Sequence, residues 1–225
     1  MTSTPPAPPR SRNGGPRPHV GVLLPAGTAA VVRSELLALR PGAARYHYAE
    51  LPAESGPDGL PAAVTAGLTR LSSDGQRLAG VLLADTTPVR FPEGLPIRPV
   101  TAFEAIVEAL GPGRHRAVIA APGSPRTTRV VTDGLTRRGV EVLDQASLDW
   151  PGDPARITLT QIRRLIRGLN VDARTAADVL ILASTAWPTR ALIGELTDYY
   201  GLRVLTANQA MARYAATMFR APAST

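Results

Sequence analysis

The sequence predicts an α/β protein with two similar lobes, each a parallel β-sheet flanked by helices, related to each other by pseudo-twofold symmetry. Short apolar runs alternate with segments of helical periodicity, which is the pattern of parallel sheets. The run GVLLADTTP at 80–88 is echoed 99 residues later by VLILASTAWP at 179–188. The prolines that follow two other strand candidates, Pro25 and Pro122, are 97 residues apart. This nearly constant offset indicates an internal repeat.

The first lobe is expected to span residues 19–113, after a tail at 1–18 that is rich in Pro, Gly, Ser and Arg and is expected to be disordered. Four prolines and glycines in the stretch 91–99 disfavour long regular structure there. A Thr-x-x-Glu capping box at Thr101 and Glu104 then opens a helix. The predicted elements are a strand at 19–24, a helix at 29–39, a strand at 45–51, a helix at 60–71, a strand at 78–84 and a helix at 101–110.

The second lobe is expected to span residues 114–220, and its last helix can cross over to the first lobe. Asp153 and Pro154 supply an N-cap and a first-turn proline, and apolar residues follow at helical spacing as far as Leu169. The predicted elements are a strand at 116–121, a helix at 124–138, a strand at 140–143, a helix at 154–169, a strand at 179–183, a helix at 188–200, a strand at 203–206 and a helix at 208–219.

Composition excludes several classes of protein. A chain of 225 residues with 44% hydrophobic residues can bury a sizeable core. No apolar run approaches the roughly 20 residues that a membrane span needs, and the N-terminus lacks the apolar region of a secretory signal. We therefore expect a cytoplasmic protein with no membrane partner. The absence of cysteine removes disulfides, thiolate nucleophiles and cysteine-ligated metals.

The net charge of +7 raises nucleic acid as a partner, but the distribution of charge argues against it. All 25 basic residues are arginines, they are scattered along the chain, and aromatic residues amount to only 4%. A base-stacking platform needs more aromatic side chains than that. No nucleic-acid partner is expected.

Polar residues follow the two repeated apolar strands and define a candidate site. Asp85, Thr86 and Thr87 end one strand, and Ser184 and Thr185 end the other. In open parallel sheets, ligands bind at the carboxyl ends of strands beside topological switch points. A carboxylate there can serve as a general acid or base, although an aspartate that satisfies backbone amides in a turn fits the same position.

The other polar candidates have structural interpretations as well. Ser184 lacks a neighbouring base, because none of the three histidines lies at the carboxyl end of a predicted strand. A hydrogen-bonding or oxyanion role is therefore favoured over a nucleophilic one. The structural alternative for Ser184 is N-capping of the helix that follows. Asn208 is expected to cap the last helix, and a contact to substrate is an additional hypothesis. The turn at Gly123 could hold an anion through backbone amides.

These stretches resemble the Asp/Glu racemase superfamily and, within it, the branch of maleate cis-trans isomerase and arylmalonate decarboxylase. The resemblance implies two lobes that close over a small carboxylate-bearing substrate, with no metal or organic cofactor. It also implies a carbanion, enolate or thioether intermediate formed with the help of one or two cysteines. The motifs that carry the resemblance lie at 21–25, 84–87, 94–110, 121–122, 178–185 and 205–210.

The departures from that family pattern concern its reactive residues. The family's two cysteines fall on Asp85 and Ser184, so neither thiol is present. A family tyrosine falls on Gly123 and an asparagine on Thr28. Thr86 and Thr87 occupy positions that bind the substrate carboxylate in the decarboxylase branch, and by the same resemblance Thr28, Thr185, Gly123 and Asn208 complete the predicted substrate-binding set.

Two functional hypotheses follow. The first is a cofactor-independent isomerase or lyase in which Asp85 moves a proton at a small carboxylate-bearing substrate and Ser184 assists. The second is a catalytically inactive relative that keeps the fold and the carboxylate cradle as a ligand-binding or scaffold protein. In either case a homo-oligomer, a dimer or a tetramer, is expected.

Overall fold

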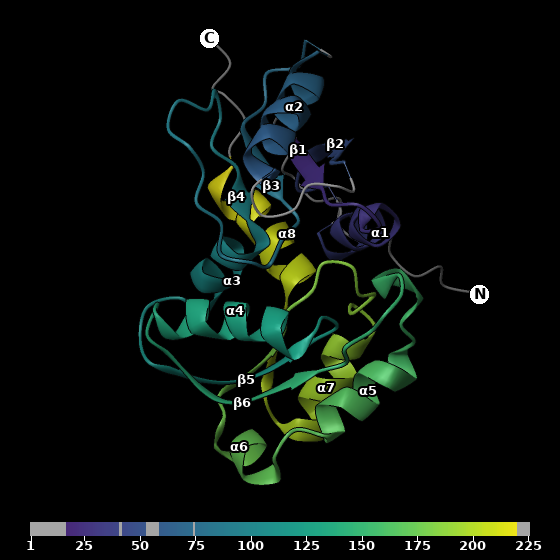
Figure 1. Cartoon of the computed structure of the whole chain (residues 1–225), viewed down its shortest axis with the longest axis vertical. Helices are drawn as coiled ribbons and strands as arrows, with labels where there is room; N and C mark the ends of the chain where they lie inside the picture. The colour runs from purple at the N-terminus through teal and green to yellow at the C-terminus, as the bar shows by residue number, and fades with distance from the viewer. Residues whose placement is uncertain (1–16, 41, 53–58, 74, 220–225) are drawn as a thin grey trace, which may run out of the picture.

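The computed structural model describes residues 17–40, 42–52, 59–73 and 75–219, and contains two four-stranded sheets in which every neighbouring pair is parallel (Figure 1). The predicted fold class is confirmed. Most of the predicted tail, at 1–16, lies outside the described residues, as does position 220. In spatial order, the strands of the first sheet are β2 (Arg45–Glu50), β1 (His19–Leu24), β3 (Gly80–Leu83) and β4 (Val100–Thr101). Those of the second sheet are β6 (Val140–Ser147), β5 (His115–Ala121), β7 (Val179–Leu182) and β8 (Arg203–Thr206).

The two sheets have the same strand order, so β1, β2, β3 and β4 correspond to β5, β6, β7 and β8. The central strands β3 and β7 are buried along their whole length, as expected for strands covered on both faces. The helices that cover the sheets are α1 (Ala29–Leu39), α2 (Leu60–Ser72), α3 (Ala102–Leu110), α4 (Pro125–Thr136), α5 (Leu159–Arg167), α6 (Val171–Ala176), α7 (Leu192–Tyr200) and α8 (Ala207–Met218).

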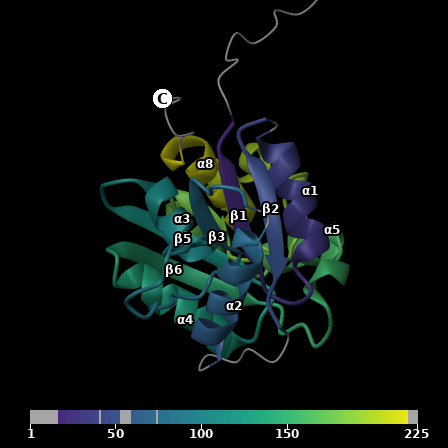
Figure 2. The ribbon, with the colours of Figure 1, turned by 90° about the horizontal axis from the view of Figure 1, so that it is seen from above.

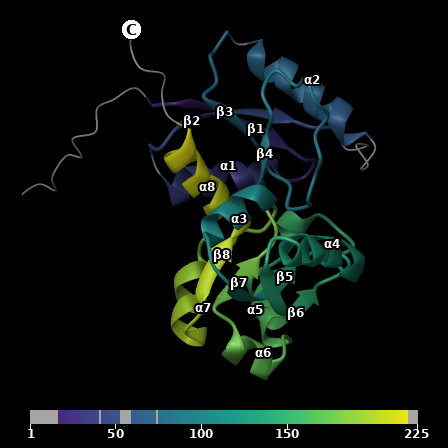
Figure 3. The same ribbon diagram turned by 90° about the vertical axis from the view of Figure 1, so that its left-hand side faces the viewer.

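Each sheet has an outer face and an inner face. On the first sheet α2 covers the outer face, while α1 and α8 lie on the inner one (Figure 2, Figure 3). On the second sheet α5 and α7 pack on the outer face, and α3 and α4 contribute to the core at the inner face. One continuous hydrophobic core therefore joins the inner faces of both sheets.

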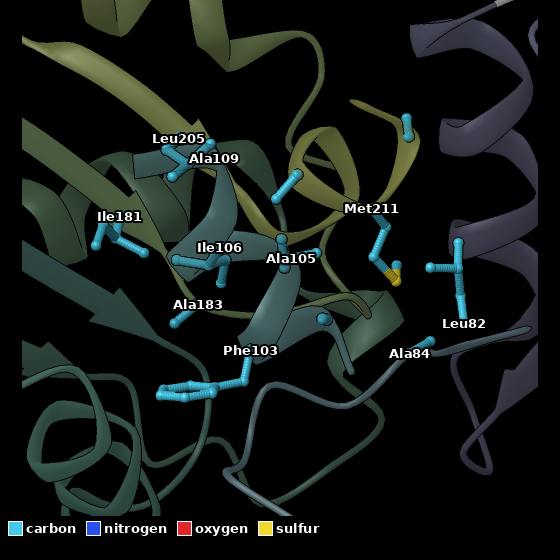
Figure 4. Packing of buried hydrophobic residues seen from close by; sticks show 14 of the residues in the cluster. Leu82, Ala84, Phe103, Ala105, Ile106, Ala109, Ile181, Ala183, Leu205 and Met211 are labelled. Carbon is cyan, nitrogen blue, oxygen red and sulfur yellow. The ribbon is translucent and has the colours of Figure 1, made fainter. Parts of the chain in front are cut away.

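The last helix of each half packs across the boundary between the halves. Ile106 of α3 lies beside Ile181 of β7, whereas Met211 of α8 faces Leu82 of β3 (Figure 4). α3 and α8 also pack against each other, and the Arg203 guanidinium donates to the carbonyl oxygen of a residue at the end of α3. The exchange of helices ties the two halves into one unit.

Several element boundaries differ from the sequence predictions. The helix predicted at 154–169 is divided into a 3₁₀ turn (Pro154–Arg156) and α5, because Asp153 caps the turn and a second capping box, Thr158 with Gln161, restarts the helix. The helix predicted from Pro188 begins only at Leu192. The two-residue strand β4 and the short helix α6 carry too little periodicity to be predicted.

The capping box at Thr101 is confirmed, since its hydroxyl accepts from the Glu104 N–H at 3.0 Å and the Glu104 carboxylate accepts from the Thr101 N–H at 3.0 Å. Among the described residues, no helix is both long enough and apolar enough to cross a membrane.

Candidate functional site at the carboxyl edges of the two sheets

The strand order places a switch point in each sheet. From β1 the chain turns to β2 on one side, and β3 then joins β1 on the other side, with the same arrangement around β5. The loops after these central strands therefore flank the crevices where ligands bind in open parallel sheets. Those loops are 25–28, 84–88, 122–124 and 183–191.

Two threonines join the central loops of the two halves reciprocally. The Thr86 hydroxyl donates to the Ala183 carbonyl oxygen at 3.4 Å, and the Thr185 hydroxyl donates to the Ala84 carbonyl oxygen at 2.8 Å. Both pairs connect equivalent positions of the repeat, so the local pseudo-twofold axis passes between them. The two hydroxyls are occupied in holding the lobes together, which sequence spacing alone does not show.

The Asp85 carboxylate combines the two roles that its position suggested. Its Oδ1 accepts from the Thr87 N–H at 2.8 Å and from the Thr87 hydroxyl at 2.7 Å, which forms an Asx turn. Its Oδ2 makes no hydrogen bond within the part of the chain that the structure describes. Both Asp85 and Thr87 line a cavity of about 760 Å³. One oxygen thus holds the turn while the other is available to a ligand.

The cavity has mostly apolar walls and two cationic side chains. Its volume lies within the range of small-molecule sites, about 300–1,000 Å³, and exceeds what a four-carbon diacid fills. Arg90 and Arg126 line it and both are exposed. Neither guanidinium group makes an ion pair or hydrogen bond within the described residues. The remaining lining residues are Pro25, Ala26, Leu51, Pro52, Leu60, Pro61, Pro88, Val89, Thr127 and Val130.

Sequence reasoning missed these two arginines. A signal for Arg126 was available, because it stands in the first turn of a helix that follows a strand, where an anion is favoured. Arg90 lies five residues beyond Asp85 in an irregular stretch, and no periodicity indicates where its side chain points. Their shared cavity follows only from packing the first-half loop against α4.

The structure does not place the other predicted site residues on this cavity. Ser184 is buried, and its Oγ accepts from the Ala186 N–H at 3.2 Å. Thr28 is also buried and donates through its hydroxyl to the Pro25 carbonyl oxygen at 2.7 Å. The structure therefore brings Asp85 and Thr87 together on the cavity, whereas Ser184 does not line it.

Gly123 and Asn208 make hydrogen bonds within the protein and do not line the cavity. The Gly123 carbonyl oxygen accepts from the Asp149 N–H at 3.1 Å. The prediction that Asn208 caps the last helix was wrong, because Thr206 is the N-cap and accepts from the Gln209 N–H at 3.0 Å. Asn208 is instead fully buried and donates from Nδ2 to the Thr185 carbonyl oxygen at 3.0 Å.

Asn208 also donates to a buried carboxylate, Glu35 of α1, at 3.1 Å. The same carboxylate accepts from the Arg190 N–H at 2.8 Å and from the Thr189 hydroxyl at 3.3 Å. Burial raises the pKa of Glu35 above its ordinary value of 4.5, and the hydrogen bond from the Arg190 N–H, followed by those from the side chains, opposes this rise.

Two backbone amides in the loops after β3 and β7 have no hydrogen-bond partner in the described part of the chain. Neither the Thr86 N–H nor the Thr185 N–H donates a hydrogen bond within the described residues. The loops around them are otherwise well bonded, since the Asp85 N–H donates to the Leu83 carbonyl oxygen at 2.8 Å. Free N–H groups at strand ends can bind a carboxylate or the oxygen of an enolate.

No protein-family model matches the sequence, and no curated protein matches it. Solved structures do match. Arylmalonate decarboxylase is 20% identical with a TM-score of 0.70, covering 90% of this chain and 94% of that chain. A cysteine-to-serine mutant of Nocardia farcinica maleate cis-trans isomerase, with a covalently bound succinylcysteine intermediate, is 18% identical with a TM-score of 0.68. The match covers 88% of this chain and 90% of that chain. The maleate isomerase Iso of Pseudomonas putida S16 is 17% identical with a TM-score of 0.69, covering 89% and 93%.

At this level of identity the comparison concerns the fold. The chain has the two-lobed, racemase-like fold of arylmalonate decarboxylase and maleate isomerase.

Proposed function

We propose that this chain is a cofactor-independent isomerase or lyase that acts on a small carboxylate-bearing substrate through an enolate-type intermediate. The observation that carries the proposal is the free Oδ2 of Asp85 on a cavity at the carboxyl edge of the first sheet. The names of the structurally similar proteins, a decarboxylase of arylmalonates and an isomerase of maleate, support the same reaction class.

In the proposed reaction Asp85 moves one proton. Its Oδ2 takes a proton from, or returns one to, the carbon beside the substrate carboxylate, while the electron pair is held as an enolate. The free N–H groups of Thr86 and Thr185 are suited to the developing negative charge on the enolate oxygen. The bond between Thr87 and Oδ1 fixes the orientation of the Asp85 carboxylate. No thiol chemistry is available, because the chain has no cysteine.

The proposed proton chemistry is one-sided. In deuterated water, with an α-substituted arylmalonate as the probe, loss of CO2 leaves an enolate, and we expect Asp85 to place deuterium on one face of its carbon. NMR should then show a single stereoisomer of the product. Ser184 offers no second acid, because its hydroxyl lies off the cavity and accepts from the Ala186 N–H. Ser184→Ala removes the acceptor of the Ala186 N–H, so it should act on the rate only through the position of this loop, by no more than the roughly 1–3 kcal/mol of one hydrogen bond, without abolishing turnover. Racemised, doubly labelled product would contradict the one-base mechanism.

Arg90 and Arg126 are proposed to attract and orient the anionic substrate. In the double variant Arg90→Gln/Arg126→Gln, we expect binding of maleate to weaken about tenfold, because hydrogen bonds to charged groups are roughly twice as strong as neutral ones. Isothermal titration calorimetry measures this change. The matched control is Arg129→Gln, since Arg129 is exposed on the same helix and does not line the cavity. Equal affinity in the double variant and the control would refute the assignment.

The inactive-relative hypothesis rests on a specific observation. Six of the eight predicted site residues do not line the cavity, and both threonines nearest the symmetry axis hold the lobes together. A ligand-binding protein would bind small carboxylates and gain thermal stability from them, with no exchange of substrate protons at any pH. The deuterium experiment therefore separates the two hypotheses.

A further inference from the structure

A second basic pocket lies away from the candidate site, between the two halves of the chain. Its volume is about 330 Å³, and none of its lining residues lines the cavity that holds Asp85. It is formed by the end of α1, the strand β8 and the helix α8, and its lining residues are Leu39, Arg40, Arg203, Val204, Leu205, Gln209 and Arg213. α1 begins beside the candidate site and runs about 16 Å before it reaches this pocket.

Three guanidinium groups converge on this pocket, and no acidic residue lines it. The side chains of Arg40 and Arg213 make no hydrogen bond or ion pair within the described residues, and the Arg203 guanidinium donates only to the Ala109 carbonyl oxygen. Glu108 lines a neighbouring hollow together with Arg213 but forms no ion pair with it. The positive charge of the pocket is therefore not neutralised by the described part of the chain.

The side chains that line the pocket are carried by regular elements and by the end of α1, which fix their positions. Gln209 and Arg213 are four residues apart on α8, so they lie on the same face of that helix. The Gln209 Oε1 is buried without a hydrogen-bond partner in the described part of the chain, and the amide nitrogen of the same side chain is the group that can donate to an anion. Arg40 is the C-cap residue of α1, at the negative end of that helix.

We propose that this pocket binds a compact polyvalent oxyanion, with a diphosphate group as the best match. Guanidinium groups bind phosphate and carboxylate oxygens with paired hydrogen bonds. An anion between several guanidinium groups also lowers the electrostatic repulsion between their positive charges. The volume of about 330 Å³ holds a diphosphate and lies at the lower end of the range of small-molecule sites. The bound anion would connect α1 of the first half to β8 and α8 of the second.

Binding is tested with inorganic pyrophosphate on the full chain, by calorimetry and by thermal unfolding at constant ionic strength. We expect saturable binding and a rise in the thermal midpoint, neither of which sodium chloride reproduces. The variant Arg40→Gln/Arg213→Gln should weaken binding about tenfold or more, because two charge-assisted contacts are lost. Since neither guanidinium group makes a hydrogen bond or ion pair within the described residues, this variant should be about as stable as the wild type without ligand.

Two further sets of measurements test where the ligand binds and which kind of anion the pocket prefers. Arg138→Gln, an exposed arginine outside the pocket, should leave the affinity unchanged, and Arg90→Gln/Arg126→Gln should do the same because those residues line the other cavity. Citrate in place of pyrophosphate distinguishes a polycarboxylate from a phosphate ligand, and tighter binding of citrate would overturn the choice of diphosphate. Unchanged pyrophosphate affinity in Arg40→Gln/Arg213→Gln would overturn the site itself.

Discussion

Replacing Asp85 by asparagine is expected to abolish turnover while the fold stays intact. The amide keeps an oxygen that can accept from the Thr87 N–H and hydroxyl, so the turn is preserved. What is lost is the ability to carry a proton, and general acid–base catalysis contributes about 10²–10⁴-fold to a rate. The rate on an arylmalonate or on maleate and the far-UV circular dichroism spectrum together check both parts of this expectation.

The matched control is Asp178→Asn. Asp178 also accepts from a backbone N–H, that of Arg116 at 3.0 Å, but it lies at the opposite edge of the second sheet, just before β7. Its replacement should leave turnover unchanged. Full activity in Asp85→Asn would show that this carboxylate does not move the proton, whereas loss of activity in both variants would trace the effect to folding.

Replacing Glu35 by alanine should cost about 3 kcal/mol of unfolding free energy at acid pH, where the carboxyl group is protonated in the folded protein. A hydrogen bond contributes roughly 0.5–1.5 kcal/mol, and three are lost. The donors, on Arg190, Thr189 and Asn208, all belong to the second half. Denaturant unfolding measures the change. The control Glu50→Ala removes only an exposed ion pair with Arg33 and should cost less than about 1 kcal/mol.

The contribution of Glu35 should also depend on pH in a defined direction. Its pKa is raised in the folded state, so the folded protein holds the proton more tightly than the unfolded chain. The stability that this group contributes is full below the ordinary value of 4.5 and is lost as the pH rises through the folded-state pKa. The unfolding free energy of the wild type minus that of Glu35→Gln should therefore fall as the pH rises from acid to neutral. A value of this difference that rises over the same range would contradict the raised pKa.

The sequence was sufficient for those parts of the fold that depend on local patterns. Apolar runs of strand length, helical periodicity and the capping box at Thr101 are written in neighbouring residues, so the elements and their parallel arrangement could be predicted. The repeat likewise placed Asp85 and Ser184 at equivalent strand ends. The short strand β4 and the divided helix before α5 were missed because two or three residues carry little periodicity.

By itself, then, the sequence determined the α/β class, the two-lobed repeat and the absence of thiol chemistry. The tertiary structure alone decided which polar groups meet. Glu35 looks like a surface residue of α1 until loop 188–191 and α8 cover it. Arg90 and Arg126 share a cavity only because the loop after β3 packs against α4. Periodicity indicates which face of an element is apolar. Arg90 and Arg126 are 36 positions apart, and Glu35 and Asn208 are 173 positions apart, so whether they meet depends on how the elements pack, which no local pattern encodes.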